Sequence, residues 1–201
     1  MSDLLQVPEN ITFEGAIALT QSLLDQVEQG RLGQPLGETV SKLLATPNGA
    51  RGFFVAYLTD RRPLADQPEP ELIDALKSSP STVSELLVKN LAMSTAMALT
   101  HQRNDQADQA QQSLQVSRRS AELIQKVGGD RLRQEAHSLW QSATRQGATR
   151  QGATWQSATW QGATDSTEPY KEFLEKWGYD AEQKTAIAAR LEGLLFQGEV
   201  S

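Results

Sequence analysis

The chain has 201 residues, a formal net charge of −6, no cysteine and a hydrophobic share of 38%. This length suits one domain, or one domain with a small appendage, and the modest apolar share predicts that part of the chain lies outside a packed core. The absence of cysteine excludes disulfides and thiolate metal sites, and the negative charge argues against a dedicated nucleic-acid binder, whose affinity comes mainly from neutralised phosphates.

The first eighty residues are expected to be helical, with one ambiguous stretch. Thr12 can cap the first helix, and Gly30 and Gly33 end it. Residues 51–59 favour a strand by the propensity of their aromatic and β-branched side chains. No second convincing strand is available to pair with them, and a lone strand leaves its backbone groups unpaired, so a helix is predicted there. The helices expected in this part cover residues 13–28, 37–45, 51–59 and 71–77, with a proline-containing loop at 61–70.

Residues 80–101, like residues 48–60, are rich in apolar side chains, and they are expected to form the central core helix. The stretch begins with a proline, which suits the first turn of a helix, and Ser79 before it can cap the free amides. Its apolar side chains cover most of the helix circumference, which is typical of a helix surrounded by others. Charged residues interrupt the run, so a membrane span is not expected. Met93 and Met97 could alternatively form a groove for partner peptides.

The second half of the chain also predicts helices. A narrow apolar stripe begins at residue 107 and ends at Val127, before two glycines, and Asp130 can cap the helix that follows. Near the C-terminus a helical pair is expected at residues 168–177 and 181–195. Apolar side chains, Trp177 among them, are expected to form the contact between the two helices. The predicted fold class is all-α, an irregular multi-helix bundle with a C-terminal helical pair.

The segment between residues 140 and 164 contains five copies of a five-residue repeat, WQSAT, RQGAT, RQGAT, WQSAT and WQGAT. A five-residue period gives no continuous face on a helix and sends successive aromatics to opposite faces of a strand. The exchanges between copies match single-base codon differences, as expected from slippage in a short DNA repeat. We therefore predict a low-complexity, flexible linker at 140–164, between a helical bundle at residues 1–139 and the C-terminal pair at 165–201, which could pack on the bundle.

The repeat also allows two more specific interpretations. The copies superficially resemble the pentapeptide-repeat β-helix, but Arg145 and Arg150 occupy the position that this family fills with leucine or phenylalanine, and five copies make about one coil. Alternatively, Trp140, Trp155 and Trp160 could stack on single-stranded nucleic acid such as RNA with help from the two arginines. No broader basic field supports that binding, so nucleic acid is an unlikely partner.

Three stretches together resemble a family of uncharacterised, helical cyanobacterial proteins. They are NGARGFFVAYLTD at residues 48–60, SELLVKNLAMSTAMALTHQRN at 84–104 and YKEFLEKWGYDAEQKTAIAARL at 170–191. The resemblance covers most of the chain except the repeat. It implies a cytoplasmic cyanobacterial protein and carries no activity and no catalytic residues.

No motif for catalysis, a cofactor or a metal is recognised. The two histidines, His101 and His137, stand alone near expected helix ends, without the spacing of a metal site. His101 is expected at the C-terminal end of the core helix, where the dipole favours a cation. Phosphate loops and the GxSxG elbow are absent, and paired acids such as Glu172 and Glu175 are expected on solvated faces. We therefore expect no catalytic, cofactor-binding or metal-binding residues.

The charged candidates for binding are arginines beside the aromatic segment. Arginine next to exposed aromatic rings is typical of interface hot spots. The possible protein interface therefore consists of Arg51, Phe53, Tyr57, Arg61 and Arg62.

A structural role for these arginines is the alternative. They could hold local carboxylates such as Asp60 and Asp66 at the surface. Arg118 and Arg119 are expected on a solvated edge of their helix.

The leading functional hypothesis is a soluble, cytoplasmic, non-catalytic module that binds another protein. The cytoplasmic expectation rests on an N-terminal stretch without the basic start and apolar run of a secretion signal. The rival is an enzyme, or a binder of a pigment or lipid, with a cavity between helices. That cavity would be lined by Phe53, Phe54, Tyr57, Met93 and Met97. RNA binding through the repeat is a weaker third option.

Overall fold

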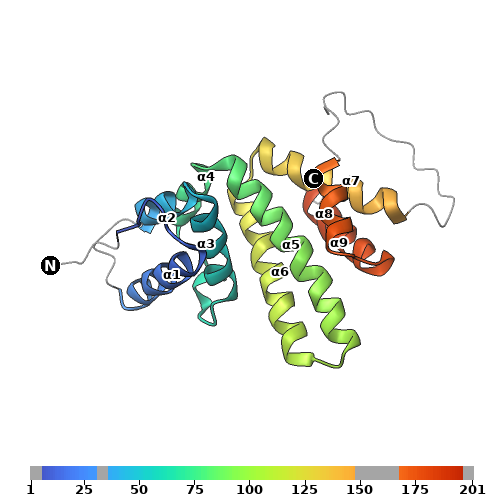
Figure 1. Cartoon of the computed structure of the whole chain (residues 1–201), viewed down its shortest axis with the longest axis horizontal. Helices are drawn as coiled ribbons and strands as arrows, with labels where there is room; N and C mark the ends of the chain where they lie inside the picture. The colour runs from blue at the N-terminus through green and yellow to red at the C-terminus, as the bar shows by residue number, and fades with distance from the viewer. Residues whose placement is uncertain (1–5, 31–35, 148–167, 197–201) are drawn as a thin grey trace. The chain divides into compact units, whose positions relative to one another are not determined.

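The computed structural model describes residues 6–30, 36–147 and 168–196, and these residues are all-α (Figure 1). No strand occurs among them, so the predicted fold class is confirmed, and residues 51–59 are helical as predicted. The elements are α1 (Phe13–Glu28), α2 (Leu36–Leu44), α3 (Pro47–Thr59), the 3₁₀ helix η1 (Pro63–Ala65), α4 (Pro70–Lys77), α5 (Pro80–Arg103), α6 (Ala107–Val127), α7 (Asp130–Gly147), α8 (Glu168–Lys176) and α9 (Ala181–Leu195).

Local signals account for the helix boundaries. The Thr12 hydroxyl accepts a hydrogen bond from the Gly15 amide at 3.0 Å, which caps α1 as expected. Asp180 caps α9 in a reciprocal box, in which its carboxylate accepts from the Gln183 amide and the Gln183 side chain accepts from the Asp180 amide. Gly128 follows the end of α6 with φ of +59°, a conformation that favours glycine.

The chain forms two compact units that are discontinuous in sequence. The first unit comprises residues 1–91 and 115–132, and the second comprises residues 92–114 and 133–201. Helix α5 therefore belongs to the first unit up to residue 91 and to the second unit from residue 92. Helix α6 belongs to the second unit up to residue 114 and to the first unit from residue 115. No feature of the sequence marked these divisions. The sequence-based boundaries at residues 139 and 164 stay a prediction.

In the first unit, α1 and α3 approach each other very closely. A β-carbon at Gly52 on α3 would lie 2.5 Å from the Ala16 β-carbon and 2.7 Å from the Phe13 carbonyl oxygen, so only glycine fits there. The aromatic rings of α3 form the centre of this unit. The Phe53 ring lies 5.3 Å from Phe54 in an edge-to-face arrangement and 5.4 Å from Tyr57 in a stacked one.

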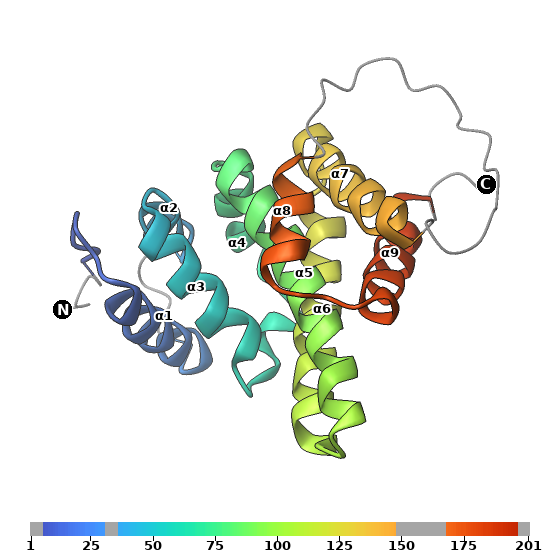
Figure 2. The same cartoon turned by 45° about the vertical axis from the view of Figure 1, so that its right-hand side comes forward.

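In the second unit, polar contacts join α9 to the last part of α5, and the two helices lie side by side in Figures 1 and 2. The buried Gln183 side chain donates to the Ala96 carbonyl at 3.2 Å and to the Thr100 hydroxyl at 2.9 Å. The Arg103 guanidinium pairs with the carboxylates of Asp180 and Glu182. Gln183 thus satisfies a backbone carbonyl and a hydroxyl group that lie 87 and 83 residues away in sequence.

The predicted helical pair α8–α9 is confirmed, but the expected role of Trp177 is wrong. Its side chain is 52% exposed. Gly178 has φ of +62°, and after this turn the Tyr179 amide donates to the Leu174 carbonyl. The buried side chain of Tyr179, whose ring lies 6.1 Å from that of Phe173, takes the place expected for the tryptophan.

The first copy of the repeat belongs to α7. Trp140 packs its ring 5.6 Å from Phe196, and Ser142 and Ala143 are buried. The first eight residues of the expected linker, 140–147, are thus helical. The second copy, at residues 145–149, extends beyond the end of α7, and the last three copies lie wholly within 148–167, outside the described residues.

The described helices do not meet the requirements of a membrane span. Within residues 6–30, 36–147 and 168–196, none combines the length and the apolar content that crossing a bilayer requires. This includes the central helix α5, whose Met97 side chain is exposed.

Candidate interaction site

The structure separates the five predicted interface residues into buried and exposed groups. Phe53 is 1% exposed and Tyr57 is 3% exposed, because both rings point into the first unit. Arg51 and Arg61 are exposed, and Arg62 is partly buried. A partner approaching α3 would therefore meet the arginines and not the two rings.

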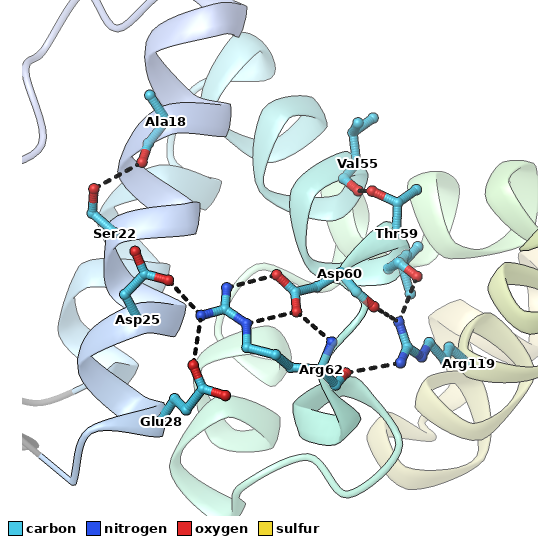
Figure 3. Close-up of polar contacts among 10 residues, drawn as sticks. Ala18, Ser22, Asp25, Glu28, Val55, Thr59, Asp60, Arg62 and Arg119 are labelled. Atoms are coloured by element: carbon cyan, nitrogen blue, oxygen red, sulfur yellow. Dashed lines mark hydrogen bonds and ion pairs between the residues drawn. The ribbon is translucent and has the colours of Figure 1, made fainter.

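A narrow stripe of α3 faces outward. Arg51, Val55 and Thr59 are exposed at steps of four residues, whereas the residues between them are buried. Val55 is 40% exposed, and the Thr59 hydroxyl donates to the Val55 carbonyl at 2.7 Å (Figure 3). The Arg51 guanidinium lies over the Phe13 ring, 5.4 Å from its centroid. Arg61 follows the stripe. We call Arg51, Val55, Thr59 and Arg61 the α3 surface.

Arg62 joins the loop after α3 to α1. Its guanidinium donates to the Asp60 carboxylate through Nε at 2.8 Å and Nη2 at 2.7 Å, and Nη1 reaches Asp25 and, at 3.4 Å, Glu28 (Figure 3). The hydrogen bond from Arg62 lowers the pKa of Asp60, and the same contact raises the pKa of Arg62. The alternative expectation, that an arginine of this segment holds Asp60, is confirmed for Arg62.

Arg119 is the largest of the fully buried side chains in the described chain, with 0% exposure, so its expected place on a solvated edge is wrong. Its Nε and Nη2 donate to the two oxygens of the Asp66 carboxylate, each at 2.9 Å. Nη1 donates to the carbonyls of Leu58 at 3.0 Å and Asp60 at 2.6 Å, and Nη2 also donates to the Arg62 carbonyl at 3.0 Å. A guanidinium has five N–H donors, and here all five are used.

Asp66 receives a second arginine from the same helix. Arg118, which is exposed, donates to Asp66 at 3.0 Å. The hydrogen bond from Arg119 is the largest cause of the lowered pKa of Asp66. A carboxylate held in this way stays ionised at neutral pH and is a weak base, whereas general acid–base catalysis needs a pKa near the working pH. The cluster around Arg62 and Arg119 is therefore suited to holding the chain in place.

Two of the five residues foreseen for a pigment or lipid cavity line a small cavity in the described part of the chain. A cavity of about 20 Å³ in the first unit admits about one water molecule. Phe53 and Tyr57 line it with residues such as Leu24, Leu64 and Leu72. The Tyr57 hydroxyl donates to the Leu64 carbonyl at 3.3 Å, and burial raises its pKa. Phe54 is not among the lining residues, and Met93 and Met97 belong to the second unit.

The histidines show no metal-binding arrangement. His101 lies in the last turn of α5, as expected, with Nδ1 at 2.7 Å from the Gln106 side-chain oxygen. The His137 ring lies 5.7 Å from that of Trp140. In the described ranges, no three histidine or acidic side chains gather in a group that could hold a metal ion.

The residues proposed for RNA stacking can be placed only in part. Trp140 is partly buried and Arg145 is exposed, both on α7. Arg150, Trp155 and Trp160 lie outside the described residues.

Sequence reasoning missed Arg119 and Asp66 as a pair. The stripe predicted on α6 was narrow, but Ser120 and Leu123 are buried in addition to Ser117, Ala121 and Ile124, so the inner face is wider. Leu123, one turn after Arg119, was the available signal that Arg119 could lie on the inner face.

The fold and this site define a helical protein whose arginine–carboxylate cluster secures a loop between helices. Residues 12–194 match the model of a family described as uncharacterised conserved protein UCP020893, and the chain belongs to this family. Comparison with curated proteins found no match, and comparison with solved structures found none either.

Proposed function

We propose that the protein is a non-catalytic interaction module that binds another protein through the α3 surface. The observation that carries the proposal is the contrast among neighbouring arginines. Arg62 and Arg119 are occupied by carboxylates and carbonyls, whereas no carboxylate of the described residues lies within ion-pair distance of Arg51 or Arg61. Two available guanidinium groups with an exposed valine between them provide the side-chain types that dominate protein interfaces.

The size of the surface supports a segment of a partner as the ligand. Arg51 and Thr59 are eight residues apart on α3, about 12 Å along the helix axis. Arg51 is also partly ordered by its contact with Phe13, which lowers the entropy lost on binding. A cytoplasmic location and a cyanobacterial origin, both expected from the sequence, belong to the same proposal.

The test is a pull-down from lysate of the source cells, with quantitative mass spectrometry of the captured proteins. The double variant R51E/R61E reverses both exposed charges, and R133E reverses a third exposed arginine, on α7, as a matched control. We expect one protein to be captured equally by the wild type and R133E and at least tenfold less by R51E/R61E. Thermal melting must show that all three fold. Equal capture by all three would contradict the proposal.

A further inference from the structure

We propose that Arg119 is a positioning residue that holds the exposed loop carrying Arg61 in one conformation and couples this loop to α1. The part of the inference that concerns partner binding rests on the proposed function. The part that concerns the loop itself stands on the contacts of Arg119 and Arg62.

The first observation is the placement of the bonds from Arg119. Its guanidinium holds the carbonyl of Asp60 at 2.6 Å and that of Arg62 at 3.0 Å, and these two residues flank Arg61. The Leu58 carbonyl at the end of α3 and the Asp66 carboxylate after η1 complete the set. One buried side chain of α6 thus fixes the backbone on both sides of Arg61.

The second observation is that the contacts of Arg119 continue through Arg62 to α1. Arg62, whose carbonyl accepts from Arg119, extends its guanidinium to Asp25 and Glu28 on α1 (Figure 3). The Asp60 carboxylate receives both the side chain and the backbone amide of Arg62, the latter at 2.8 Å. Helix α6, the loop and α1 are therefore joined in series through two arginines.

The third observation is that apolar packing restrains this loop little. Among residues 60–69, Ala65 alone is buried, and Arg61, Pro63, Gln67 and Glu69 are exposed. Hydrogen bonds to carbonyls from a planar five-donor group are directional, so they can fix the backbone where packing does not. A surface held in one conformation before binding loses less entropy when a partner docks.

Hydrogen exchange of the full chain tests the coupling. The variant R119K keeps the charge but loses the planar fork, and L123A removes buried bulk one turn further along α6 while leaving the guanidinium in place. The reporters are the amides of Arg62 and Asp66 in the loop and of Gln29 and Gly30 at the end of α1, each of which donates a hydrogen bond. Amides of α8 and α9 are the internal reference.

We expect all four reporters to exchange at least tenfold faster in R119K than in L123A, after both are normalised to the reference amides. Unchanged exchange in R119K would overturn the proposal. Acceleration in the loop without acceleration in α1 would overturn the coupling through Arg62.

The pull-down described above separates this inference from the proposed function. Weaker capture by R119K, together with faster loop exchange, would support positioning of Arg61. Full capture by R119K would show that positioning does not serve binding. If R51E/R61E captures the partner as well as the wild type does, the proposed function is contradicted. The exchange result, and with it the coupling of the loop to α1, would still stand.

Discussion

Arg119 shows what a buried charge requires. Because no water reaches this guanidinium, its protons must bond to the protein, and four residues of one short stretch provide the acceptors. The requirement also runs in the other direction. The Leu58 carbonyl lies near the end of α3, where the helix offers no further amide to donate to it. It accepts a hydrogen bond from Arg119 of α6 instead.

The variant R119A is expected to lower the free energy of unfolding by about 3–5 kcal/mol, because it leaves three carbonyls without this donor and leaves the Asp66 carboxylate with Arg118 alone. The exposed neighbour is the control, and R118A should cost less than about 1 kcal/mol. Urea denaturation of both variants measures the difference. Similar costs for the two would show that water replaces the buried contacts.

Acid should weaken the same cluster. The pKa values of Asp60 and Asp66 are lowered in the folded protein, so these carboxylates stabilise it above their unfolded pKa of about 3.9, and this stability is lost as the pH falls through the lower folded values. We expect stability to be flat from about pH 7 to 5 and to decline below about pH 4.

The variant D66N tests this pH dependence. It should be less stable at pH 7 and show a shallower acid decline, whereas D74N, at an exposed carboxylate 4.0 Å from Lys77, should follow the wild type. Urea denaturation between pH 3 and 7 measures both. An unchanged acid decline in D66N would assign the transition to other groups.

At the scale of helices, the pairing of α1 and α3 depends on a missing side chain. Alanine usually favours a helix over glycine by about 1 kcal/mol. At Gly52, however, the new β-carbon would overlap backbone and β-carbon atoms of α1.

The variant G52A is therefore expected to destabilise the protein by about 1–3 kcal/mol, as overpacking does. G15A is the control on α1. Its β-carbon would lie 3.1 Å from the Thr12 Oγ1 atom and 3.5 Å from the Ile11 Cγ1 atom, and both of these are side-chain atoms. Thermal unfolding compares the two. A more stable G52A would show that α1 and α3 can separate without cost.

The pairing of α9 with α5 depends on one buried amide. Q183A removes donors to Ala96 and Thr100 and the acceptor of the capping box. We expect a loss of about 1–3 kcal/mol in the free energy of unfolding, since a buried carbonyl loses a partner. The exposed Gln125 on α6 provides the control Q125A, with little change. Equal stability of the two variants by urea denaturation would contradict this role.

At the scale of the whole molecule, the part of the repeat that the structure describes includes one packed copy, at the end of α7. Trp140 lies against Phe196 and His137, and its loss in W140A should cost about 2 kcal/mol, less than a fully buried tryptophan. If the linker prediction holds for the later copies, deletion of residues 150–159 should change the free energy of unfolding by about 0.6 kcal/mol or less. A large loss on deletion, measured by urea denaturation, would show that those copies are packed.

The helices and their ends could be predicted from the sequence because their causes act within a few residues. Thr12 and Asp180 cap their helices through amides three residues away, and Gly128 and Gly178 end helices with positive φ. The all-α class followed from the same local patterns. The repeat obscured one boundary, since α7 continues into its first copy.

Only the tertiary structure decided which of these side chains are buried. Arg119 is buried because the loop after α3 offers acceptors of the right geometry, and Trp177 is exposed because Tyr179 occupies the interior. Gly52 is required because α1 lies against it. Each outcome depends on a segment at a different place in the chain, and periodicity within one helix carries no information about which partner covers it. The sequence by itself therefore determined the helices, and long-range packing determined the surface that they present.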